Sequence, residues 1–172
     1  MSNDSLNFVA GSVFGNLIDA QLKQERDRKT SLEQRGMALV TAAGTLVALA
    51  FAFATFAKGG SGVSLSALAK GFFIAALVAF IVSGIFGVLT NKPALYGEAD
   101  VRQLKRLTKE DHWIWNDVPG AARRVAELEV SMIASGRTAN AAKARHLRNS
   151  ILLLFAALCL LSAAIITVLV SA

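Results

Sequence analysis

Apolar residues along this chain gather in three long runs that contain no Asp, Glu, Lys or Arg. The runs cover residues 36–57, 71–91 and 149–172. Each reaches the roughly 20 residues that an α-helix needs to cross about 30 Å of hydrocarbon, and no stretch alternates in the manner of a strand. We therefore expect an all-α membrane protein with three transmembrane helices, the first two forming a hairpin.

The three predicted spans differ in apolar content. Each Leu, Ile, Phe or Val near a helix centre favours insertion by about 0.3–0.6 kcal/mol. Span 149–172 has thirteen such residues and span 71–91 has twelve, which favours insertion of either by at most about 4–8 kcal/mol. Span 36–57 has eight, diluted by Ala, Gly and Thr, and gains about 2–5 kcal/mol. We expect the first span to be the weakest and to depend on its hairpin partner.

The segments between the spans complete the expected organisation. Residues 1–35 form an N-terminal cytoplasmic helical segment, and 58–70, rich in Gly and Ser, form an external hairpin loop. Residues 92–148 form a cytoplasmic helical segment that begins with a short basic amphipathic helix at 98–110. A second helix, with Pro119 in its first turn, continues without a strong breaker into the last span. That helix is predicted to be about 50 residues long.

Composition supports the membrane class, and the position of the charge sets an orientation. Hydrophobic residues make up 54% of the 172 residues and charged residues only 17%, against roughly 25% charged in soluble domains. The pI near 9.9 could indicate nucleic acid, but the basic residues are placed otherwise. Five Lys or Arg precede the first span, eleven lie in 92–148, and only Lys58 and Lys70 lie in the hairpin loop. Because Lys and Arg mark the cytoplasmic side, we expect an inner-membrane protein with a cytoplasmic N-terminus and an external C-terminus, and no nucleic-acid partner.

Small residues in line within the spans, and a heptad-like pattern before the last one, predict helix packing. Small side chains let helices approach closely in lipid, and a spacing of three and four residues is typical of a coiled-coil seam. The predicted seam includes Ser135, Ala139, Ala142 and His146 and packs either within the chain, against residues 4–35, or between copies. The residues predicted to pack helices within or between chains are Gly44, Ala48, Ala52, Gly71, Ala75, Ala79, Ser83, Gly87, Val125, Leu128 and Met132.

Candidate chemistry is sparse. His112 and His146 lie far apart without the usual zinc spacing, and no nucleophile elbow or phosphate-binding loop is present. The spans carry hydroxyls and Cys159 but no ionisable acid or base, so ion-coupled transport has no visible machinery. The hydroxyls are expected to bond to their own helix backbone. We predict a non-enzyme without metal or cofactor, with Trp113 and Trp115 as anchors at the membrane interface.

The stretches LEQRGMALVTAAGTLVALAFAF, NKPALYGEAD and RTANAAKARHLRNSILLL resemble those of small actinobacterial three-helix membrane proteins. More distantly, the order of hairpin, cytoplasmic helices and basic helix leading into the last span resembles the Pycsar effector family. That family commonly carries an acidic residue and a lysine where its first span begins, whereas this chain has Gln34, Arg35 and Gly36. The resemblance implies an antiphage effector that assembles and impairs the membrane on binding a cyclic nucleotide. The basic residues that would then meet an anionic ligand, or otherwise lipid and solvent, are Arg102, Lys105, Arg106, Arg123, Arg124, Arg137 and Lys143.

Two interpretations of function remain open. In the first, an oligomeric membrane protein receives a cytoplasmic signal, an anionic second messenger or a protein partner, through its cytoplasmic helices and acts on the bilayer. In the second, the chain is a structural scaffold or accessory subunit of a membrane complex, or a small channel. The visible role of the spans in either case is to pack against one another and against copies of themselves.

Overall fold

The computed structural model describes residues 3–59, 66–93 and 118–171, and the described residues are helical apart from short helix ends. Three long helices follow one another: α1 (Asn3–Gly59), α2 (Ala67–Thr90) and α5 (Val118–Ser171). The all-helical fold and the long last helix, 54 residues in the structure, agree with the sequence predictions. The basic helix predicted at 98–110 and both tryptophans lie outside the described residues. So do residues 60–65 of the hairpin loop predicted at 58–70, whereas the two ends of that predicted loop are helical, in α1 up to Gly59 and in α2 from Ala67.

Each of the three helices is long and apolar enough to cross a membrane. The mean hydropathy of their most apolar windows is 2.1, 2.7 and 2.9 in chain order, so the first span is the least apolar, as its composition predicts. Many large apolar side chains on them are exposed, with Ile81 58% and Phe155 68% accessible. Such a surface suits hydrocarbon rather than water. The chain is therefore an all-α protein with three candidate membrane spans, which indicates a multi-pass membrane protein.

Local sequence explains where α2 begins and ends. The Ser66 side chain accepts a hydrogen bond from the backbone N–H of Ala69 at 3.2 Å, the usual N-cap arrangement. At the other end Asn91 caps the helix by donating its backbone N–H to Leu89 and Val88. Pro93 follows two residues later, and the chain cannot continue as a regular helix into a proline. The predicted stop of the second span is thus confirmed within one residue.

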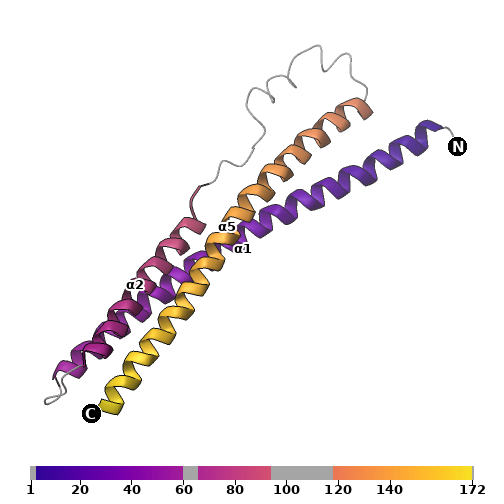
Figure 1. Ribbon diagram of the computed structural model, residues 1–172. Coiled ribbons are helices and arrows are strands. Elements are labelled where there is room, and N and C mark those ends of the chain that lie inside the picture. The colour runs from indigo at the N-terminus through magenta and orange to yellow at the C-terminus, as the bar shows by residue number, and fades with distance from the viewer. Residues whose placement is uncertain (1–2, 60–65, 94–117, 172) are drawn as a thin grey trace. The chain divides into compact units, whose positions relative to one another are not determined.

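The chain forms two compact units. Unit 1 contains Met1–Thr30 and Pro93–Ala141, and unit 2 contains Ser31–Lys92 and Ala142–Ala172. The boundary between the units falls inside α1, after Thr30, and inside α5, after Ala141, so each of these helices contributes residues to both units. In unit 2 the parts of α1, α2 and α5 lie side by side, and the end of α1, the start of α2 and the end of α5 lie at one end (Figure 1).

The core of unit 2 is built from small residues around one aromatic ring. Ala76, Phe80 and Ala157 are fully buried and form the central cluster, and the partly buried residues packed against it are Leu46, Val47, Ala79, Leu154, Leu160 and Leu161. Buried positions on α2 recur at Ala69, Ala76, Ser83 and Thr90, which are spaced by seven. A seven-residue repeat is typical of helices that supercoil around one another.

Candidate functional site

Helices α1 and α2 approach each other closely at Gly36 and Gly87. A Cβ added to Gly36 would lie 2.9 Å from the Asn91 side-chain nitrogen, 3.0 Å from Thr90 Cβ and 3.1 Å from the Gly87 carbonyl oxygen. A Cβ added to Gly87 would lie 2.8 Å from a Val40 methyl and 3.2 Å from the Gly36 carbonyl oxygen. Each glycine therefore admits the backbone of the other helix, the geometry by which small residues join helices in lipid.

Helices α2 and α5 are joined by a reciprocal serine pair. The Ser83 hydroxyl donates to the carbonyl of Ser150 at 2.8 Å, and the Ser150 hydroxyl donates to the carbonyl of Ser83 at the same distance. The two hydroxyl oxygens are 3.2 Å apart, and both side chains are fully buried. Since every polar atom of the pair is hydrogen-bonded, the cost of burying the two hydroxyls in an apolar bundle is offset.

The serine pair is also the exception to the expected pattern of hydroxyl bonding. Local bonds to the carbonyl three or four residues earlier are confirmed at Thr41, Thr45, Thr55, Thr90, Ser162 and Thr167. For Ser83 the same expectation is wrong, because its hydroxyl donates to the Ser150 carbonyl of α5 instead. The hydroxyls of the spans therefore serve two purposes, of which only the inter-helix one determines packing.

Helices α1 and α5 are joined within unit 2 by an ion pair between Glu33 and Lys143. The Lys143 side chain is 4% exposed and the Glu33 side chain 33%. On the next turn of α5 the His146 ring lies 6.0 Å from the Phe86 ring of α2, centroid to centroid. The glycine crossing, the serine pair and this ion pair all lie in the half of unit 2 that is farther from the start of α2. We call them the polar layer: Glu33, Gly36, Ser83, Gly87, Lys143 and Ser150.

In unit 1, Glu25 of α1 receives three hydrogen bonds from α5. The Arg137 Nε donates to Glu25 Oε1 at 3.3 Å, and the Asn140 amide donates to both Oε2 and the main-chain carbonyl of Glu25 at 3.0 Å. Arg137 also donates to the Gln21 side chain at 3.0 Å. Asn140 is fully buried. A Cβ added to Gly136 would lie 3.9 Å from the Cβ of Glu25, at ordinary van der Waals distance. These contacts show that the helix before the last span packs against the N-terminal segment of the same chain.

A second acidic residue of unit 1, Glu129, lies where burial and a neighbouring carboxylate disfavour its ionised form. Burial raises the pKa of Glu129 above its ordinary value of 4.5, and the charge of Asp19 with a hydrogen bond to it raises that pKa further. Arg26 opposes the shift. The carboxyl groups of Glu129 and Asp19 repel each other when both are ionised.

The structure places the predicted packing residues on two kinds of surface. On α2, Ser83 and Gly87 are buried and Ala79 is half-buried, whereas Gly71 and Ala75 are exposed. On α1, Gly44, Ala48 and Ala52 are all exposed. On α5 the predicted seam is half-buried at Leu128, Met132, Ser135, Ala139, Ala142 and His146 and exposed at Val125.

The buried seam of α5 lies one residue farther along than the predicted one. Its members are Ile133, Gly136, Asn140, Lys143, Leu147 and Ser150, which also alternate at spacings of three and four. Half of them are polar, so a search for apolar spacing selects the neighbouring register. Glu25 and Glu33 of α1 bond to Asn140 and Lys143. Ser150 bonds to α2 through the serine pair. The sequence signal for this register is the presence of acidic residues on α1, Glu25 and Glu33, that can bond to polar residues of α5.

The basic residues predicted to meet an anion are engaged within the chain wherever the structure describes them. Arg123 pairs with Glu127 at 3.2 Å on the exposed surface of α5, and Arg124 also has an interaction within the chain. Arg137 and Lys143 hold Glu25 and Glu33. An anion that reached Lys143 would have to displace a carboxylate from a buried site. Arg102, Lys105 and Arg106 lie outside the described residues, so anion binding there stays a prediction.

Neither metal chemistry nor known relatives add to this picture. Within the described ranges no three His, Cys, Asp or Glu side chains lie close enough to hold a metal ion. No family model matches the chain, and no curated protein or solved structure compared with it is similar. The resemblance to the Pycsar effector family stays a prediction.

Proposed function

We propose that this protein is a non-enzymatic, oligomeric protein of the inner membrane whose cytoplasmic helices receive a signal or a partner. Its copies associate through the outward face of α1, and the state of the cytoplasmic helix pair reaches the membrane through α1 and α5. The distribution of basic residues supports a cytoplasmic N-terminus, a cytoplasmic 92–148 segment and an external C-terminus.

The observation that carries the proposal is the composition of the exposed face of α1. The buried positions of the span, Gly36, Ala43 and Ala50, define one side of the helix. At 100° per residue the opposite side carries mainly small residues and, at its borders, Met37 and Leu49, all exposed. The small residues are Thr41, Gly44, Thr45, Ala48, Ala52 and Thr55. Nothing lies within 4 Å of the position of a Cβ on Gly44. We call this surface the small face of α1.

The other two helices present a different surface to their surroundings. The exposed positions of α2 include Ile74, Val78 and Ile81, and those of α5 include Leu152 and Phe155. Large apolar side chains are the ordinary choice against lipid, whereas a face of Gly, Ala and Thr lets a second helix approach closely. The threonine hydroxyls on the small face are bonded to their own helix, so an approaching helix meets methyl groups and backbone. A second copy of α1 fits this surface.

The continuity of α1 and α5 supports the signalling part of the proposal. Both helices carry specific side-chain contacts in unit 1 and in unit 2, at Glu25 with Arg137 and at Glu33 with Lys143. No break separates the two contacts along either helix. In this proposal a partner or ligand that changes the first contact biases the second, because the same two helices carry both contacts. The antiphage-effector role is the sharpest version of this function and rests on the resemblance alone.

The assembly is tested by Ala48→Leu on the small face. The added side chain keeps close helices apart, so the oligomer of the wild-type chain, measured by light scattering in lipid nanodiscs or mild detergent, should shift toward monomer, with dissociation favoured on the order of tenfold or more. Ala156→Leu is the matched control, because Ala156 is exposed on α5 beside Leu152 and Phe155. A monomeric wild-type chain, or an Ala48→Leu oligomer of unchanged size, refutes the interface.

The signalling role needs a separate measurement in cells. A membrane-impairing effector should lower the membrane potential, read by a potential-sensitive dye, when the chain is overproduced or its signal is supplied. A scaffold or accessory subunit should be tolerated at the same level. Normal potential at high expression with cyclic nucleotide present contradicts the effector version and leaves the oligomeric scaffold.

A further inference from the structure

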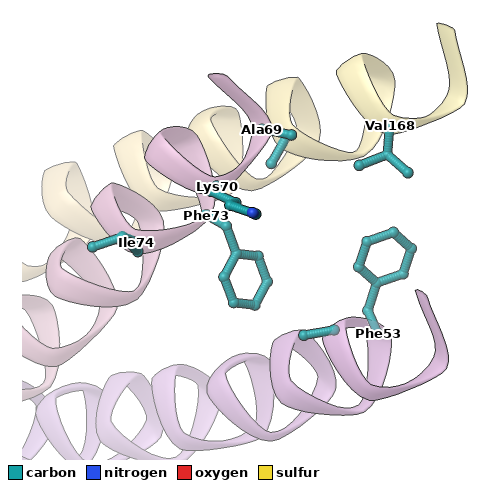
Figure 2. A pocket seen from close by; sticks show the side chains of 8 residues that line it. Phe53, Ala69, Lys70, Phe73, Ile74 and Val168 are labelled. Atoms are coloured by element: carbon teal, nitrogen blue, oxygen red, sulfur yellow. The ribbon is translucent and has the colours of Figure 1, made fainter. Parts of the chain in front are cut away.

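An apolar cavity of about 160 Å³ lies among the three helices at the end of unit 2 opposite the polar layer. Phe53 of α1 and Phe73 of α2 face the same space, with Val168 of α5 beside it (Figure 2). The remaining wall is made by small residues and by two longer side chains of α2. The complete lining is Phe53, Ala54, Ala69, Lys70, Phe73, Ile74, Ala164 and Val168.

The size and lining of the cavity select hydrocarbon. Apolar cavities of about 150 Å³ in proteins stay free of water and take up benzene or xenon. The walls here offer one polar side chain, that of Lys70, and otherwise aromatic rings and methyl groups. Alanines at 54, 69 and 164 leave the space that a Leu at any of these positions would fill. In a bilayer the hydrocarbon that surrounds such an opening is the acyl chain of a lipid.

Lys70 gives the cavity a charged rim. It is three residues from the first residue of α2, about 4.5 Å along the helix axis, and its side chain extends along the edge of the cavity (Figure 2). The first turn of α2 carries no acidic residue, and none of the described carboxylates forms a salt bridge with Lys70. A lysine whose stem lies on apolar surface near the end of a span places its ammonium at the headgroup level. The charge there complements a lipid with a net negative headgroup.

We propose that this cavity takes up part of one acyl chain of an anionic phospholipid, whose headgroup phosphate lies against the Lys70 ammonium. The site belongs to a single chain, since all three helices of unit 2 contribute to it. It rests on the three helices spanning a membrane and is independent of self-association. A lysine near the membrane surface favours an anionic over a zwitterionic headgroup by about fivefold, and the cavity adds a place for the chain that an ordinary surface lysine lacks.

Native mass spectrometry of the full chain, released from vesicles of equal parts phosphatidylglycerol and phosphatidylcholine, tests the site. We expect one retained lipid per chain, with phosphatidylglycerol favoured by about fivefold. Lys70→Gln should keep the retained lipid but reduce the preference to near one. Lys92→Gln is the control, because Lys92 is an exposed lysine at the opposite end of α2, and it should leave the preference unchanged.

The position of the acyl chain is tested by filling the cavity from two helices separately. Ala164→Leu and Ala54→Leu should each reduce the retained lipid at least fivefold, whereas Ala156→Leu, on the exposed surface of α5, should not. Ala54 is only half-buried, so its variant gives a result even where Ala164→Leu fails to fold. Retention by Ala54→Leu equal to that of the wild type overturns the proposal, as does a Lys70→Gln variant with unchanged preference. A wild-type chain that retains neither lipid overturns it as well.

Discussion

The glycine crossing between α1 and α2 makes a prediction whose sign differs between two glycines on one helix. Replacing Gly by Ala inside a helix gains about 1 kcal/mol from helix propensity. At Gly84 nothing lies within 4 Å of the new methyl group, so Gly84→Ala should be stabilising by up to that amount. At Gly87 the methyl would lie 2.8 Å from a Val40 methyl and 3.2 Å from the Gly36 carbonyl oxygen. Overpacking of this kind costs about 1–3 kcal/mol.

The net effect at Gly87 is a loss of about 0–2 kcal/mol, so the two variants should differ by about 1–3 kcal/mol. Gly36→Ala should resemble Gly87→Ala, because its methyl meets three atoms of α2 at 2.9–3.1 Å. The assay is unfolding of the purified chain in rising SDS mole fraction, followed by energy transfer between dyes on α1 and α2, at a concentration where the chain is monomeric. Equal stability of Gly84→Ala and Gly87→Ala would refute the close approach of the two helices.

Three further predictions concern the polar contacts. In a double-mutant cycle, Ser83→Ala and Ser150→Ala should show a coupling free energy of about 0.6–1.7 kcal/mol in the same unfolding assay; additive effects would contradict the reciprocal bonds. Lys143→Met leaves the half-buried Glu33 carboxylate without its cation, so it should lower the free energy of unfolding in the same assay by about 1–3 kcal/mol. Combining it with Glu33→Gln, which removes the unpaired charge, should recover part of that loss. Because the folded pKa of Glu129 is raised above 4.5, its contribution to stability is greatest below pH 4.5 and is lost as pH rises through the folded pKa. Glu129→Gln should therefore stabilise unit 1 at pH 7, measured by slower hydrogen exchange, whereas the exposed Glu127→Gln should not.

The sequence determined the architecture because membrane spans obey a local rule. A charge-free run longer than the bilayer is thick must form a helix, since lipid offers no partner to an unbonded backbone. The runs 36–57, 71–91 and 149–172 therefore located three candidate spans, and the absence of a breaker before the last one predicted the long α5. The proline after α2 fixed its end for an equally local reason, the missing N–H of Pro93.

Only the tertiary structure decided which side of each helix is inside. Apolar periodicity identifies the core face in water, but every face of a span can be apolar in lipid, and packing then depends on small residues and bonded polar groups. On α5 the buried positions include Asn140, Lys143 and Ser150. A search for regularly spaced apolar residues selects their neighbours instead. These polar residues can be buried because a carboxylate or a carbonyl on another helix, far away in the chain, bonds to each of them. Because small residues suit both a buried and an exposed face of a span, the sequence did not distinguish Gly44, Ala48 and Ala52 from the buried small residues of α2. The structure places these three residues on the exposed face of α1.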